Sequence, residues 1–406
     1  MSSTGLNRSL SLPLLIFYGV GTILGLGIYV LVGKISGEAG MLSPFAFLIA
    51  AILAGFTGLS YGELSSRIPK SAGEVNYVDK AFGNFGLSTS VGWLIIISAI
   101  ISTSTVVNGY VGYTQIFLDW PPWLIITLIT TILGGVAVWG IRQSAFLITI
   151  ITIIEILGIL IVVYAGADHL SSFPSRWPEL LPAFKWSDWE AIAAGTFLAF
   201  FTFIGFEDLV NVSEEAKNPE RDMPKAIIIS LVILTFLYMV VALIANFALS
   251  QTALDQSDAP LADIVAEQGS FYPRVIGIVS LVAIVNGVLV QIIMCSRVAM
   301  GMAKIGMAPS IMKDINPSTQ TPLKGTIMIV AVILALALLF ELEGLAKATN
   351  YVLLLVFMFV NLSLIVIKRR DPDPEGVRTF SPIVPYLGFI FSLVVFSVEL
   401  ISNFTN

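Results

Sequence analysis

The chain has 406 residues, of which 56% are hydrophobic and only 12% charged, and its mean hydropathy is +0.91. This composition is too apolar for a soluble protein and predicts an all-α integral membrane protein. The net charge of −6 provides no basic surface for a nucleic acid, and a single cysteine, Cys295, excludes an intrachain disulfide.

Apolar runs long enough to cross about 30 Å of hydrocarbon predict about eleven transmembrane helices. Their expected ranges are 12–34, 41–63, 87–114, 122–141, 145–166, 190–210, 226–249, 274–301, 325–341, 346–367 and 383–402. The polar connections are too short to fold independently. We therefore expect one membrane domain over residues 1–406.

Basic residues predict the orientation of the chain in the membrane. About sixteen of the 21 Lys and Arg residues fall on the side of the N-terminus, which the positive-inside rule places in the cytoplasm. An odd number of helices then puts the C-terminus outside. We expect a multi-pass protein of the cell membrane, and the sequence does not predict an oligomeric state.

The first predicted helix contains the sequence GVGTILGLGIY, from Gly19 to Tyr29, with four glycines. Each glycine costs a helix interior about 1 kcal/mol relative to alanine. Irregular backbone at membrane depth is tolerated only where it is buried in protein or lines a cavity. The glycines therefore predict either a broken helix at a binding site or close helix packing of the GxxxG kind.

A second interrupted helix is predicted at 190–210, where GTFLAFFTFIGFED carries Gly205 and runs into Glu207 and Asp208. It follows the first break by five helices. Glycine-interrupted segments at matching positions of two halves indicate an inverted-repeat secondary transporter with its site between the breaks. We expect one repeat over about 12–166, a second over about 190–367, and an extra helix at about 383–402.

The two breaks predict a site for a zwitterion. Backbone N–H groups at a helix N-terminus bind a carboxylate, and freed carbonyls near Phe201 and Ile204 can accept from an ammonium group. Phe201 or Phe203 is a candidate gate, although aromatic stripes more often only pack. The expected substrate-binding residues are Ile23, Leu24, Gly25, Leu26, Gly27, Phe201, Phe203, Ile204 and Gly205.

Glu155 is expected in the middle of the fifth helix, in ITIITIIEILGILIVVYAG. A charged residue there costs insertion about 3 kcal/mol, so an intramembrane carboxyl is a functional candidate. Burial favours its protonated form, and Glu155 could carry the coupling proton. The alternative is a permanently neutral glutamic acid that ties helices together. Glu207 and Asp208 are expected in a cytoplasmic vestibule, where either could relay protons or attract a cationic substrate.

Three blocks of sequence resemble the amino acid, polyamine and organocation permeases. They are GVGTILGLGIY, the loop IPKSAGEVNYVDKAFG at 68–83, and FFTFIGFEDLVNVSEEAKNPERDMPKAI at 200–227. The resemblance covers nearly the whole chain and implies a five-plus-five inverted repeat of the leucine-transporter type, with helices one and six discontinuous. It implies carboxylate binding at the backbone of Gly25, Leu26 and Gly27, and ammonium contacts at the carbonyls of Ile23, Phe201 and Ile204.

This sequence departs from the family at Glu155, where proton-coupled relatives and exchangers often have lysine, and it has eleven helices where many relatives have twelve. The glutamate is compatible with proton transport, with a Na⁺ ligand or with an organic cation as substrate. We expect a proton-coupled transporter of an amino acid or small amine that has no cofactor besides the coupling ion. Sodium symport and obligate exchange are the alternatives, and a sensor or an intramembrane enzyme is a remote one.

Overall fold

The computed structural model describes residues 10–25, 27–69, 73–139, 145–183, 185–316, 318–319 and 321–405. Within these ranges every regular element is a helix, and one isolated bridge joins Leu10 to Ala216. This confirms the all-α class. The long helices are α1 (Leu12–Leu24), α2 (Ile28–Ala39), α3 (Ser43–Arg67), α5 (Phe85–Gln115), α6 (Pro122–Trp139), α7 (Ala145–Gly166), α9 (Trp186–Phe201), α10 (Pro219–Ala248), α13 (Phe271–Lys304), α14 (Leu323–Leu339), α15 (Leu342–Arg370) and α16 (Ile383–Thr405).

Eight of the described helical segments are long and apolar enough to cross a membrane, and Leu12–Leu24 and Leu323–Leu339 are shorter apolar helices. The eleven expected helices are all present, with the first divided into α1 and α2. Large apolar side chains such as Ile132, Leu339 and Ile401 are more than half exposed. An apolar outer surface of this kind is what lipid requires.

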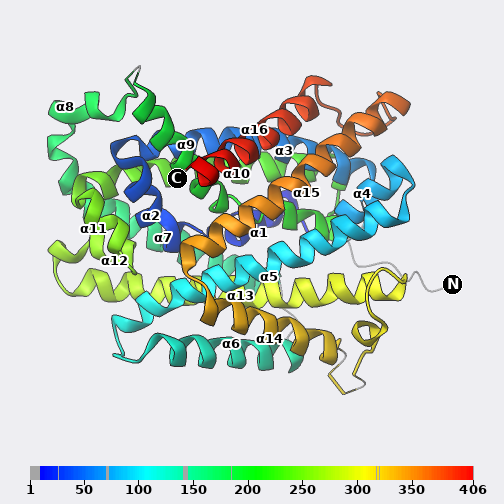
Figure 1. Ribbon diagram of the computed structural model, residues 1–406, viewed down its shortest axis with the longest axis horizontal. Helices are drawn as coiled ribbons and strands as arrows, with labels where there is room; N and C mark the ends of the chain where they lie inside the picture. Colours follow the sequence, from blue (N-terminus) through cyan, green and yellow to red (C-terminus); the bar gives the residue numbers. More distant parts are fainter. Residues whose placement is uncertain are drawn as a thin grey trace.

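The helices run roughly parallel to the long axis of the molecule (Figure 1). One end holds α4 (Gly73–Phe82) and the connections that follow α13 and α15. The opposite end holds the short helices α8 (Phe173–Arg176), α11 (Gln251–Gln256) and α12 (Pro260–Ile264). The first end carries most of the basic loops and is the one expected in the cytoplasm.

The packing of the helices has the symmetry of a five-helix repeat. Helix α3 packs against α10, α5 against α13, and α6 against α14, which are each five membrane crossings apart. Two further contacts correspond in the same way. The contact between α1 and α10 corresponds to the one between α9 and α3, and the contact between α1 and α7 corresponds to the one between α9 and α15. These contacts recur at an offset of five membrane crossings and are compatible with a five-plus-five fold.

One amphipathic helix, α4, was not among the expected elements. It follows α3 at the basic end, and its buried side chains Val75, Tyr77 and Val78 face the core. It packs against α5 and α15. It is too short and too polar to be read as a membrane crossing, but it forms one wall of the pocket described below.

Candidate functional site

The first helix is broken where the glycines predicted a break. Helix α1 ends at Leu24, α2 begins at Ile28, and no side chain caps the N-terminus of α2. Its first turn therefore presents backbone N–H groups and the positive end of the helix dipole to the break. Gly25 and Gly27 are described on either side, while Leu26 lies outside the described residues.

The glycines of this break are needed for close approach. A Cβ on Gly27 would lie only 2.4 Å from Cα of Thr202 on the chain following α9. A Cβ on Gly25 would lie 3.2 Å from the carbonyl oxygen of Ala283 and 3.3 Å from Oε1 of Glu155. Packing and a broken helix are therefore both present, so the two alternatives for these glycines are not exclusive.

The second break follows the end of α9 at Phe201. Gly205 has φ +116°, in the region that favours glycine, and a Cβ there would lie 2.9 Å from the carbonyl oxygen of Thr22. The Thr22 hydroxyl lies 3.4 Å from the Gly205 carbonyl oxygen, while the carbonyls of Tyr18 and Gly19 on its own helix are nearer acceptors, at 3.0 and 3.1 Å. The short 3₁₀ helix η4 (Glu207–Glu215) then begins. The two predicted discontinuities are thus confirmed and lie against each other.

The carbonyl groups predicted to bind the substrate's ammonium group are close to these contacts, although one of them already accepts a hydrogen bond. The Ile204 N–H donates to the carbonyl of Phe201 at 3.1 Å, which leaves that oxygen one lone pair for another donor. Ile23 and Leu24 are fully buried at the end of α1, and Ile204 is nearly so. The structure brings the described members of the predicted set together in one region.

Aromatic rings fill the space beside the second break. Phe203 packs on Tyr238 of α10 with ring centroids 5.3 Å apart, and Phe206 packs on Phe357 of α15 at 5.2 Å. Tyr61 of α3 meets Phe206 edge to face at 5.6 Å. Phe201 and Phe203 are both completely buried. Their predicted role as a gate stays a prediction, and these packed rings are what would have to separate.

Glu155 lies on α7 beside the first break. Its side chain is fully buried, and within the described chain neither carboxyl oxygen has a hydrogen-bond partner. Its backbone carbonyl accepts from the Tyr29 hydroxyl at 2.8 Å, which ties α7 to α2. Because the carboxyl is not used in hydrogen bonds between the described helices, the alternative of a merely structural glutamic acid finds no support in these contacts.

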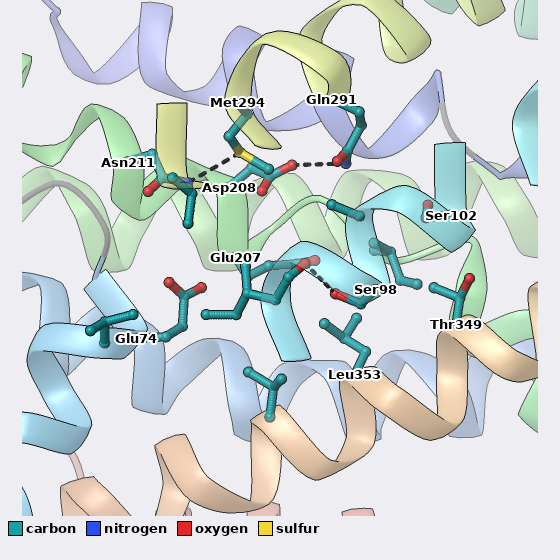
Figure 2. A pocket seen from close by; sticks show the side chains of 16 residues that line it. Glu74, Ser98, Ser102, Glu207, Asp208, Asn211, Gln291, Met294, Thr349 and Leu353 are labelled. Atoms are coloured by element: carbon teal, nitrogen blue, oxygen red, sulfur yellow. Dashed lines mark hydrogen bonds between the residues drawn. The ribbon is translucent and has the colours of Figure 1, made fainter. Parts of the chain in front are cut away.

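A pocket opens next to the second break, between α4, α5, η4, α13 and α15 (Figure 2). Its free space is small, about 30 Å³. Glu207 and Asp208 line it, as does Ile204 from the predicted site. The Gly205 N–H donates to Oε2 of Glu207 at 2.9 Å, so this carboxylate is fixed directly at the break.

Glu74, from α4, lines the same pocket and was missed as a site residue. It is 4% exposed, and burial raises the pKa of its carboxyl to about 7. The sequence block 68–83 had been singled out, but only the packing of α4 against α5 and α15 brings Glu74 toward Glu207. Ser98 and Gln291, which also line it, were likewise not predicted.

Comparisons with known proteins agree with this architecture. Residues 10–404 match the model of the amino acid permease family. The chain is 30% identical to the vacuolar cationic amino acid transporter 2 of Arabidopsis thaliana, over 91% of this chain and 61% of that protein. It is 28% identical to the branched-chain amino acid permease BcaP of Bacillus subtilis, over 96% of this chain and 87% of that protein. It is 26% identical to the methylthioribose transporter of the same organism, over 96% of this chain and 89% of that protein.

Proposed function

The chain belongs to the amino acid permease family, and from that premise we propose that it is a secondary transporter. It moves an amino acid or a related small amine across the cell membrane by alternating access. The observation that carries the proposal is the meeting of two helix breaks, where Gly27 approaches Thr202 and Gly205 approaches Thr22. Broken helices that meet at the bilayer midplane offer a substrate both N–H donors and carbonyl acceptors.

The proposed binding mode uses the shared ends of an amino acid. The backbone of Gly25, Leu26 and Gly27, between the end of α1 and the N-terminus of α2, would take the carboxylate, and the carbonyls of Ile23, Phe201 and Ile204 would take the ammonium group. These groups are backbone atoms, so they do not distinguish side chains. The relatives accordingly have names for cationic amino acids, branched-chain amino acids and methylthioribose, and the backbone site alone favours none of them.

A ligand screen followed by counterflow tests this proposal. Purified protein is heated with individual amino acids and amines, and those that raise the melting temperature are then exchanged, as labelled compounds, into proteoliposomes preloaded with the unlabelled compound. We expect at least one amino acid both to bind and to exchange. Binding without exchange would identify a sensor, and chemical conversion of the ligand an enzyme; either would overturn the proposal.

For the coupling ion we propose a proton carried by Glu155. Two features support it: the carboxyl is fully buried without a hydrogen-bond partner in the described chain, and it lies beside Gly25. A carboxyl that reaches solvent from alternate sides as the breaks rearrange can load and release a proton. Because the proton and the substrate would both bind beside the first break, a rearrangement of the break would couple their transport.

Sodium symport is the second candidate, and one observation favours it. Oε1 of Glu155 and the carbonyl oxygen of Ala283 flank the same point beside Gly25. Oxygen atoms arranged around a gap are the ligands that hard cations prefer. Uptake driven by an imposed sodium gradient at equal pH on both sides would favour this candidate over proton coupling.

A further inference from the structure

Glu155 lies against both halves of the first broken helix. Its carboxyl is close to the end of α1, where a Cβ on Gly25 would be 3.3 Å from Oε1. Its backbone carbonyl accepts a hydrogen bond at 2.8 Å from the hydroxyl of Tyr29, which is in the first turn of α2. One residue of α7 thus has its side chain beside the segment before the break and its backbone bonded to the segment after it.

The ring of Tyr29 is held between two other helices. Tyr29 is fully buried, and a Cβ on Gly158, one turn after Glu155 on α7, would lie 3.3 Å from its hydroxyl oxygen and 2.5 Å from Cγ1 of Val279 on α13. The missing side chain at Gly158 therefore lets Tyr29 and α13 both approach α7. From the other side, the Tyr113 hydroxyl of α5 donates to the Tyr29 carbonyl at 2.6 Å.

The bond from Tyr29 gives α2 a direct connection to the residue proposed to carry the proton. Helix α7 packs along α1, the half of the broken helix that precedes the break. Neither carboxyl oxygen of Glu155 has a hydrogen-bond partner in the described chain, so its position is set by the backbone of α7. A change in the angle between α1 and α2 must therefore either break the Tyr29 bond or displace Glu155 relative to Gly25.

The same turn of α2 is proposed to hold the substrate. Tyr29 follows Gly27 by two residues, and no side chain caps the N–H groups of this turn. A carboxylate bound to these groups acts on the turn that carries Tyr29. We infer that Tyr29 is the positioning residue that links substrate binding to proton binding, because its hydroxyl makes Glu155 follow the first turn of α2; this rests on the proposed function and its coupling proton.

A variant that lacks only one hydroxyl tests the inference. Proteoliposomes are prepared with the wild type, Tyr29→Phe, Glu155→Gln and Tyr77→Phe. Tyr77, on α4, is the matched control because it is equally buried and its hydroxyl has no hydrogen-bond partner in the described chain. With the best ligand of the screen, three quantities are measured: counterflow, accumulation under an inward proton gradient, and acidification of the lumen per molecule taken up.

We expect Tyr29→Phe to keep counterflow but to accumulate less amino acid and to acidify the lumen less per molecule taken up. One neutral hydrogen bond changes an equilibrium about twofold to tenfold, so the accumulation ratio should fall by at least about twofold. Tyr77→Phe should match the wild type in all three measurements.

Wild-type accumulation and acidification by Tyr29→Phe would overturn the inference. A loss of counterflow in the same proportion as accumulation would also overturn it, because Tyr29 would then have only a structural role. The proposed function fails on different results. Absence of exchange for every amino acid would reject transport, and full accumulation by Glu155→Gln would reject its coupling proton.

Discussion

Gly27 is a glycine because there is no room for a side chain. A Cβ at this position would lie 2.4 Å from Cα of Thr202, and backbone cannot move aside as the end of a side chain can. Residue 27 thus fixes how closely the first break approaches the second. The same position begins the turn of α2 whose N–H groups are proposed to hold the carboxylate.

We predict that Gly27→Val abolishes amino acid binding. The added bulk must push the two breaks apart, and overpacking of a tight contact typically costs about 1–3 kcal/mol. The measurement is the rise in melting temperature on adding the best ligand of the screen. Gly135→Val on α6 is the matched control, because a Cβ there meets nothing within 4 Å. A full ligand response in Gly27→Val would show that the carboxylate binds elsewhere.

The buried carboxyl of Glu74 should make the stability of the folded protein depend on pH. Its folded pKa of about 7 lies above the ordinary value of 4.5, so the folded protein holds this proton more tightly than the unfolded chain does. The resulting stability is complete below pH 4.5 and is lost as the pH rises to about 7. Glu74→Gln, which is always neutral, should therefore melt at a higher temperature than the wild type at pH 8 and at a similar temperature at pH 4.5.

Thermal unfolding in detergent at the two pH values measures this difference. Asp79→Asn is the control, since Asp79 lies on the same helix α4 but is exposed. A difference between Glu74→Gln and the wild type that is the same at both pH values would contradict the prediction.

At the scale of the elements, a buried ionic cluster joins α3, α15 and the chain that leads to α16. Glu63 is fully buried, and both of its carboxyl oxygens lie 2.7 Å from Nζ of Lys368. Arg67 bonds to the same carboxylate at 2.7 Å, and the Phe380 N–H donates to it at 2.8 Å. The Glu63 carboxylate has two cationic partners, and Asp371 lies 3.9 Å from Arg67, so the cluster joins the ends of these helices.

We predict that Lys368→Met lowers the free energy of unfolding by about 1.5–3 kcal/mol, because it removes charge-assisted hydrogen bonds from the buried Glu63 carboxylate, which then keeps only Arg67 and the Phe380 N–H as partners. The exposed pair of Lys324 and Asp314, at 3.1 Å, provides the comparison. Lys324→Met should cost less than about 1 kcal/mol. Equal losses of stability in the two variants, measured by thermal unfolding in the same detergent, would show that the buried cluster contributes no more than a surface pair.

Features formed by residues close together in the sequence could be predicted, whereas features formed by distant segments could not. Apolar runs and glycine spacing are local signals, and they were enough for the eleven helices and for both breaks. Helix α4 was missed because its ten residues are too few and too polar for a hydropathy criterion. The approach of Glu155 to Gly25 and the meeting of Glu74, Glu207 and Gln291 depend on packing between distant segments, for which one sequence contains no signal.

At the scale of the whole molecule, the two halves meet where they are broken. The contacts of α3 with α10, α5 with α13 and α6 with α14 relate one half to the other, and the contacts at Thr22, Gly27, Thr202 and Gly205 lie between the halves. The breaks are therefore part of the wider contact between the two halves. Glu155 borders this region.

Proton-driven uptake by proteoliposomes tests the central claim most directly. The initial rate and final level of uptake of a labelled amino acid are measured with an imposed inward proton gradient, for the wild type and for Glu155→Gln. We predict that the wild type accumulates the amino acid, and that Glu155→Gln loses accumulation but still exchanges it in counterflow. Gradient-driven accumulation by Glu155→Gln equal to that of the wild type would contradict coupling through this carboxyl.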